Sequence, residues 1–80
     1  MVVLCLGADE ALVRPVLERA GAEGEVIVLD VSPVRLEALE RALRDPRVWY
    51  LVGGGDVIPL PDRSVDEIVG NGAFDTRVLR

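Results

Sequence analysis

Histidine is absent from this sequence, and lysine and glutamine are absent with it. Without histidine, Ser-His-Asp and Cys-His catalysis are excluded. The single cysteine, Cys5, excludes an internal disulfide and leaves too few soft ligands for a zinc or non-haem iron site. Because Cys5 lies within a short apolar run, we expect it to be a small buried hydrophobic residue, and we expect no bound metal.

Positive charge is also scarce. Nine arginines stand against 14 acidic residues, which gives a net charge of -5. Binding to a phosphate backbone needs clustered basic side chains, so we expect no nucleic-acid partner. No apolar run approaches the roughly 20 residues that a membrane span requires, and no basic segment of the signal-peptide type precedes the first apolar run. We therefore expect no membrane association and a cytoplasmic location.

Half of the 80 residues are hydrophobic, which is a high fraction for so short a chain. This length predicts a single domain over residues 1–80. A chain of this size buries only a modest share of its surface, so the surplus of apolar side chains favours a partner subunit.

Four short apolar segments have the composition of strands in a parallel sheet, at residues 2–6, 25–30, 47–52 and 65–70. Helical spacing of apolar residues predicts a helix over about residues 11–20. Pro15 is expected to delay its regular part to Leu12–Arg14 or to kink it. Ser32 and Pro33 predict the start of a second helix, as N-cap and first helical residue.

The alternation of strands and helices predicts an α/β fold. Right-handed crossovers then give a Rossmann-like parallel sheet of about four strands in the order 3-2-1-4, with helices on its faces. Trp49 and Tyr50 point to opposite faces of the third strand, so at least one of them is expected in the core. For the tail after residue 70 we expect a loop with a short helix or strand at residues 76–79.

Two residues mark the carboxyl ends of the first two strands, where such sheets offer a crevice. Gly7 ends the first strand and Asp30 ends the second, 23 residues later. An acidic side chain at this spacing can accept both hydroxyl protons of a ribose. The alternative is that Asp30 caps the turn before the second helix. Asp9 and Glu10, which follow Gly7, are expected to satisfy free N–H groups and the dipole of the first helix.

The chain resembles the class I S-adenosylmethionine-dependent methyltransferases in three segments, VVLCLGADEA, EVIVLDVSPVRLEALERAL and DVIPLPDRSVDEIVGNGAF. The resemblance implies S-adenosylmethionine as a possible cofactor, with Gly7 and Asp30 among its contacts. In the family an acidic residue beyond the third strand contacts the adenine. That position is Gly54 here, and Asp56, two residues later, is the candidate substitute.

The sequence departs from the family in the first motif. Cys5 stands where the family usually has an acidic residue, and Asp9 and Ala11 stand where it has glycines. A Cβ at those positions obstructs the close approach of backbone to the cofactor, and carboxylates repel the cofactor's own carboxylate. The family's sheet normally has seven strands, whereas this sequence ends soon after the fourth.

Two functions follow as expectations. The first is a truncated, non-catalytic methyltransferase-like module that binds a second copy or another partner through the edge of the fourth strand. The alternative is a minimal or split methyltransferase that binds S-adenosylmethionine and is completed by a partner chain. A different mononucleotide-binding half-domain fits less well, because one glycine beside Asp9 and Glu10 forms a poor phosphate cradle.

Overall fold

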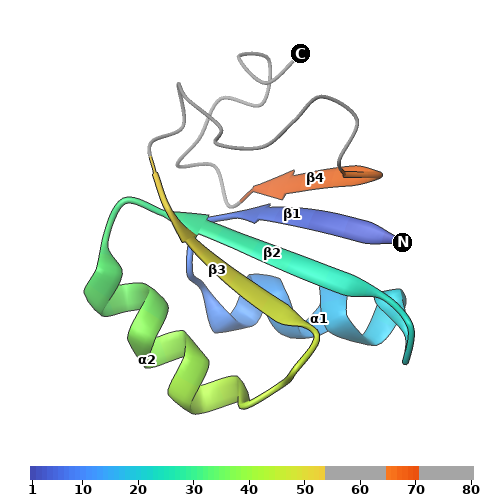
Figure 1. The fold of residues 1–80 in the computed structure, drawn as a ribbon, viewed down its shortest axis with the longest axis horizontal. Helices are drawn as coiled ribbons and strands as arrows, with labels where there is room; N and C mark the ends of the chain where they lie inside the picture. Colours follow the sequence, from blue (N-terminus) through green and yellow to red (C-terminus); the bar gives the residue numbers. More distant parts are fainter. Residues whose placement is uncertain (54–64, 71–80) are drawn as a thin grey trace.

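The structure is a computed structural model that describes residues 1–53 and 65–70. Its elements alternate between strand and helix (Figure 1), in the order β1 (Val2–Leu6), α1 (Glu10–Ala20), β2 (Glu25–Asp30), α2 (Pro33–Leu43), β3 (Val48–Val52) and β4 (Glu67–Gly70). The first two strands have the predicted bounds. The third and fourth begin one and two residues later than predicted. The expected elements at residues 76–79 lie outside the described residues.

The four strands form one parallel sheet in the order β3-β2-β1-β4. The predicted α/β class, Rossmann-like fold and strand order are therefore confirmed. The central strands, β1 and β2, read as continuous apolar runs because they are covered on both faces and hydrogen-bonded on both sides. Their carboxyl ends meet at one edge of the sheet, where Leu6 lies beside Leu29.

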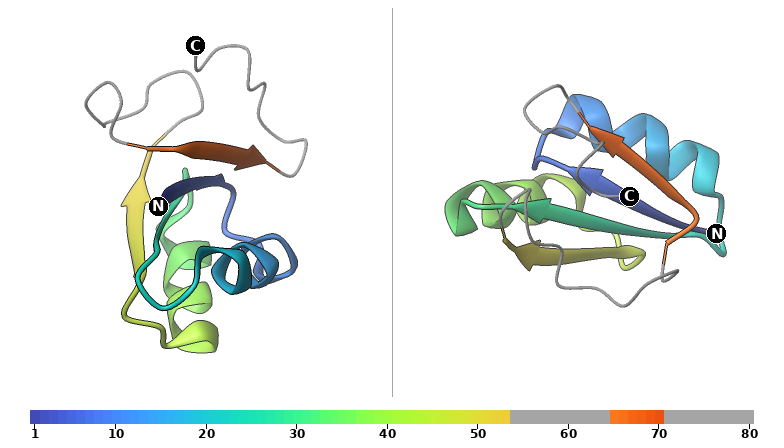
Figure 2. Two further views of the ribbon diagram at one scale, coloured as in Figure 1. Left: turned by 90° about the vertical axis from the view of Figure 1, so that its right-hand side faces the viewer. Right: turned by 90° about the horizontal axis from the view of Figure 1, so that it is seen from above.

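Both helices lie on the same face of the sheet (Figure 2), as two right-handed crossovers in the same direction require. Alternate residues of the strands meet the helices and form the larger core, which contains Val3, Cys5, Val13, Val16, Leu17, Val26, Val28, Leu36, Leu39 and Val48. The opposite face carries a second apolar cluster, built on Leu4, Leu6 and Leu29. Cys5 is fully buried, as predicted.

The start of α1 differs from the prediction. Regular helix begins at Glu10, upstream of the expected delay at Leu12–Arg14. Asp9 caps the helix, because its side chain accepts the Ala11 N–H at 2.9 Å. Pro15 lies inside the helix and cannot donate to the carbonyl of Ala11, but this removes only one hydrogen bond. The strong cap and the buried apolar face of α1 outweigh that loss.

The start of α2 agrees with the prediction. The Ser32 side chain accepts the Arg35 N–H at 3.3 Å, and Pro33 is the first helical residue. At the other end Arg44 takes a left-handed conformation with φ 48°, and its N–H donates to the carbonyl of Glu40 at 2.9 Å.

Arg47, just before β3, joins the end of α1 to the loop that follows α2. Its guanidinium donates to the carbonyls of Leu17 at 3.1 Å and Gly21 at 2.6 Å, which are acceptors at the end of α1. It also forms a two-pronged pair with Asp45, whose oxygens lie 3.0 and 2.7 Å from the donors. This one side chain therefore terminates a helix that is about 30 residues away in sequence.

Candidate functional site

The candidate site lies at the carboxyl ends of β1 and β2, where the loops before α1 and α2 meet. Gly7 ends β1 with φ 117°, a backbone angle that favours glycine, and its N–H donates to the carbonyl of Leu29 at 2.8 Å. The chain can therefore keep its pairing with β2 and turn sharply into α1. Gly7 directly follows β1 and Asp30 is the last residue of the adjacent β2, as the sequence predicted.

The Asp30 carboxylate ties the two loops together. Its Oδ2 accepts the backbone N–H of Ala8 at 2.8 Å, and its Oδ1 accepts the N–H of Ser32 at 2.9 Å. Arg35 approaches from α2, with its Nε 3.6 Å from Oδ2. Only 3% of Asp30 is exposed. The turn-capping interaction expected as one alternative is present, and it is extended by a second bond to the β1–α1 loop.

The electrostatics of Asp30 favour the carboxylate form. Burial raises its pKa, but the N–H groups of Ala8 and Ser32, and then the Arg35 charge, lower it by more. The net pKa lies below the ordinary value for aspartate. The carboxylate is therefore ionised at neutral pH, and each oxygen already has a donor. Contact between Asp30 or Gly7 and a cofactor stays a prediction.

The two acids after Gly7 serve the helix. Asp9 caps α1, and Glu10 pairs with Arg14 one turn further along. The predicted capping of a free N–H is thus confirmed for Asp9, and Glu10 lies in the first turn, as its expected interaction with the helix dipole requires. The Asp9 carboxylate occupies the free N–H of Ala11, which a glycine-rich loop would leave open to a ligand.

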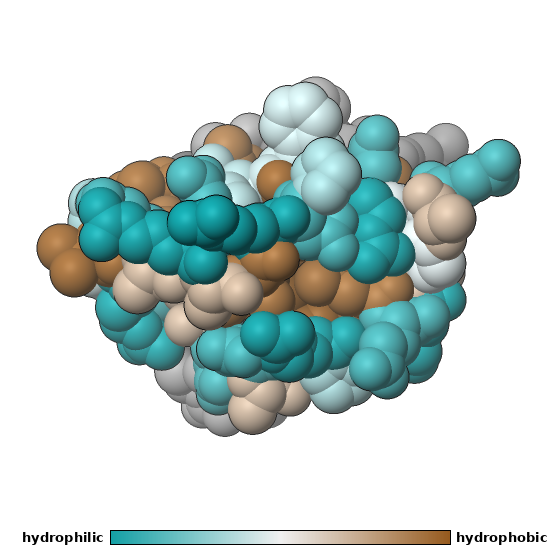
Figure 3. Space-filling model, turned by 90° about the horizontal axis from the view of Figure 1, so that it is seen from below, coloured by the Kyte–Doolittle hydropathy of each residue, from teal (hydrophilic) through white to brown (hydrophobic). Residues whose placement is uncertain are grey.

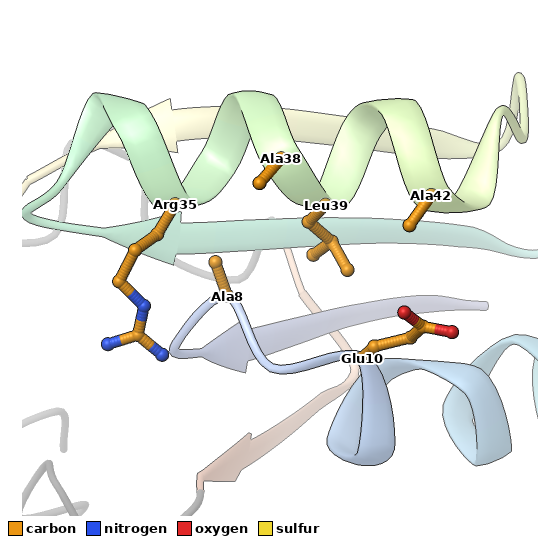
Figure 4. A pocket seen from close by; sticks show the side chains of 6 residues that line it. All are labelled: Ala8, Glu10, Arg35, Ala38, Leu39 and Ala42. Carbon is orange, nitrogen blue, oxygen red and sulfur yellow. The ribbon is translucent and has the colours of Figure 1, made fainter.

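A groove of about 280 Å³ runs between α2 and the segment that leads into α1. Figure 3 shows hydrophobic atoms along its floor between two hydrophilic ridges. In Figure 4, Arg35 lies at one end of the groove and Glu10 lies towards the other, opposite α2. The rest of the lining is small or apolar: Ala8, Ala38, Leu39 and Ala42. Such a groove can hold an apolar group between one cation and one anion.

The other residues and site types considered from the sequence add no reactive group to the candidate site within the described residues. Asp56 and the adjoining Gly54 position lie outside the described residues. Burial raises the pKa of Cys5 to about 12, so its thiol is a poor nucleophile. Within residues 1–53 and 65–70, no group of three or more His, Cys, Asp or Glu side chains is placed to hold a metal ion. In the same part of the chain, no helix is long and apolar enough to cross a membrane.

Sequence reasoning missed the role of Arg35. Its guanidinium reaches the Asp30 carboxylate from the first turn of α2 and also borders the groove. The signal was weak, because an arginine just after an N-cap has no distinctive pattern. Its position follows from Ser32, which fixes where α2 begins.

The fold is similar to that of a solved methyltransferase domain. A solved structure titled "Structure of the citrinin polyketide synthase CMeT domain" matches 88% of this chain, with a TM-score of 0.68 and 25% sequence identity. This chain spans about a fifth of the length of that structure, since 20% of it is covered. No protein-family model and no curated protein matches the sequence. The four-stranded sheet and its two helices thus have a class I methyltransferase-like fold.

Proposed function

We propose that this chain is a methyltransferase-like domain that works as a binding module and not as a catalyst. The observation that supports this most is the Asp30 carboxylate, whose two oxygens already accept the N–H groups of Ala8 and Ser32. A ribose would have to share these oxygens with both backbone donors, in a side chain that is almost fully buried. The residue that the family uses for the cofactor here holds two loops together.

The first motif supports the same reading. The second and third glycine positions of the family carry Asp9 and Ala11, which are joined by the capping hydrogen bond of α1. A cofactor carboxylate at this point would meet the Asp9 carboxylate and a helix end with one donor already used. The described residues therefore fit S-adenosylmethionine poorly.

The module would bind its partner through the outer edge of β4. This strand is a terminal strand of the sheet, and its Ile68 and Val69 are only partly buried. An edge strand with apolar residues is a ready template for another chain. The partner at this edge is a second copy or another polypeptide. We place this function in the cytoplasm, where a free thiol such as Cys5 stays reduced.

A second candidate function is a methyltransferase that binds S-adenosylmethionine and is completed by another chain. It is favoured by one observation, the position of Gly7 beside an ionised Asp30 at the carboxyl ends of adjacent strands. If a partner chain moved the loop at Ala8, the Oδ2 atom of Asp30 would be released for a ligand hydroxyl.

Calorimetric titration with S-adenosylhomocysteine separates the two functions. We expect no saturable heat up to about 1 mM ligand. A dissociation constant of about 1 mM corresponds to a binding free energy of about 4 kcal/mol, so any remaining interaction would be weaker than that. Saturable binding at micromolar concentration would overturn the non-catalytic proposal. The Asp30→Asn variant is then the control, since it keeps the shape of the side chain while removing its charge.

A further inference from the structure

The outer edge of β3 has the composition of an interface. Its sequence, VWYLV, contains no charged residue and no proline, although these are the usual means of blocking an edge strand. Trp49 is 58% exposed and Val52 is 57% exposed. At least one of Trp49 and Tyr50 was expected in the core. Tyr50 is partly buried against the helix-side core, whereas Trp49 lies outside it.

Some backbone N–H and C=O groups of β3 point away from β2, towards the outer edge of the sheet. The carbonyl of Arg47 and the N–H of Gly53 bond to β2, at 2.9 and 3.0 Å. In a parallel ladder alternate residues face the same neighbour, so Tyr50 and Val52 direct their N–H and C=O groups outward. Within residues 1–53 and 65–70 these groups have no hydrogen-bond partner. Val48 directs its carbonyl outward too, while its N–H donates to the carbonyl of Asp45 at 3.2 Å.

We propose that a second copy of this chain binds along this edge, with the two β3 strands antiparallel about a two-fold axis at Tyr50. Tyr50 of each copy then exchanges N–H and C=O bonds with Tyr50 of the other. Val52 of each copy donates to the outward carbonyl of Val48 in the other. The Val48 N–H stays bonded to Asp45, so the Val52 carbonyl of each copy has no donor in this pairing.

The same register matches the side chains. Trp49 lies opposite Leu51 of the second copy, on the face of the sheet away from the helices. Residues in this kind of pair lack direct hydrogen bonds and bring their side chains closest together. The exposed indole of each copy is thereby covered by the leucine of the other.

The α2 helices supply charge complementarity across the seam. The groove-lining Arg35, Ala38 and Ala42 face α1, so helical geometry places Glu37 and Glu40 on the opposite flank, towards the β3 edge. The Cα of Arg44, the C-cap residue, follows at the end of the same flank. Consistent with this, the charge of Glu40 contributes to the raised pKa of Tyr50, after burial.

A two-fold axis beside Tyr50 and Glu40 brings Arg44 of one copy opposite Glu37 of the other, twice. These two attractions oppose the repulsion between the two Glu40 carboxylates, which face each other across the axis. Because α2 packs over both β2 and β3, its axis and that of its mate lie about two strand spacings apart, roughly 10 Å. This is the distance at which helices pack.

The β4 edge suits a second copy less well. It has four residues, and one of them, Glu67, is charged, which is a usual means of blocking an edge strand. The β3 dimer therefore leaves β4 open for the partner of the proposed function.

Sedimentation velocity of the full 80-residue chain over a range of concentrations tests the proposal. We expect a dimer whose dissociation constant rises about tenfold or more in Trp49→Lys, as is usual for an aromatic anchor at the centre of an interface. Val34→Lys is the matched control, because Val34 is 75% exposed on the outward side of α2 and should leave the constant unchanged. Arg44→Glu and Glu37→Arg should each weaken the dimer, and the double variant should restore it.

A covalent test uses the close pair at the seam. The Trp49→Cys/Leu51→Cys variant should form a disulfide-linked dimer under mild oxidation, while Val34→Cys should not. A monomer at all concentrations up to about 100 µM, which is above the range of stable specific dimers, would overturn the proposal. So would a dimer that neither Trp49→Lys nor the charge swap affects. Binding of S-adenosylhomocysteine is measured separately on the same samples, so each proposal can fail without the other.

Discussion

The Oδ2 atom of Asp30 accepts the backbone N–H of Ala8 across 2.8 Å, and thereby joins the end of β2 to the loop that follows β1. The other oxygen accepts the N–H of Ser32. One buried carboxylate thus anchors the two loops that lead into the helices. In a sheet of this kind these two loops form the edge where a ligand would bind, so their rigidity bears directly on function.

Replacing Asp30 with asparagine should destabilise the fold. The amide oxygen can still accept one N–H, but the amide NH₂ would face the other donor. Leaving a buried donor without an acceptor costs about 1–3 kcal/mol. Urea unfolding followed by circular dichroism should show this loss at pH 7. An exposed acid offers a control, since Glu18→Gln on the outer side of α1 should change the free energy of unfolding by less than about 0.5 kcal/mol.

Acid should weaken the protein through Asp30 and Asp45. Both have folded pKa values below the ordinary aspartate value of 3.8, and the hydrogen bond from Arg47 lowers the pKa of Asp45 to about 2. The unfolded chain then binds more protons than the folded one, so stability rises with pH in this range. The contribution is complete above about pH 5, since the unfolded carboxyl titrates near 4, and is lost as pH falls towards 2.

The measurement is the urea midpoint at a series of pH values from 7 to 2. The Asp30→Asn/Asp45→Asn variant should have a weaker dependence on pH below about 4, because two of the responsible carboxyls are gone. An unchanged slope in this variant would contradict the assignment of the acid sensitivity to these residues.

Arg47 should hold the last turn of α1. Lysine in its place keeps the charge but cannot reach Asp45 with two prongs and the two carbonyls of α1 at once. We expect amide hydrogen exchange to quicken at the end of α1 in Arg47→Lys, and the melting temperature to fall. Arg41→Lys is the control, since Arg41 makes only an exposed pair with Glu37. Equal exchange in the two variants would rule out the capping role.

Much of the fold could be predicted from sequence because its signals are local. The apolar runs of β1 and β2 and the Ser32-Pro33 helix start depend on adjacent residues. The strand order followed from the handedness of crossovers. The start of α1 at Glu10 was harder to predict, because Pro15 destabilises the first turns of the helix while the Asp9 cap stabilises them. Which of the two effects is larger depends on the packing of the whole helix.

The site was less accessible to sequence reasoning. Both alternatives for Asp30, ribose contact and turn capping, need an acid at the end of β2, so the residue alone could not choose between them. The bond to Ala8 depends on how two loops approach each other, which is a tertiary property. The same holds for Arg47, whose acceptors on α1 are distant in sequence.

Restoring the glycines of the first motif tests whether that motif alone excludes the cofactor. The Asp9→Gly/Ala11→Gly variant removes the carboxylate and both Cβ atoms from the entry to α1. We expect it to be less stable by about 1–3 kcal/mol, because it loses the N-cap and adds a glycine inside the helix. We also expect no binding of S-adenosylhomocysteine, since Asp30 still bonds to Ala8 and Ser32. Calorimetry on the refolded variant checks this. Micromolar binding would mean that the altered loop, and not the engaged carboxylate, keeps the cofactor out.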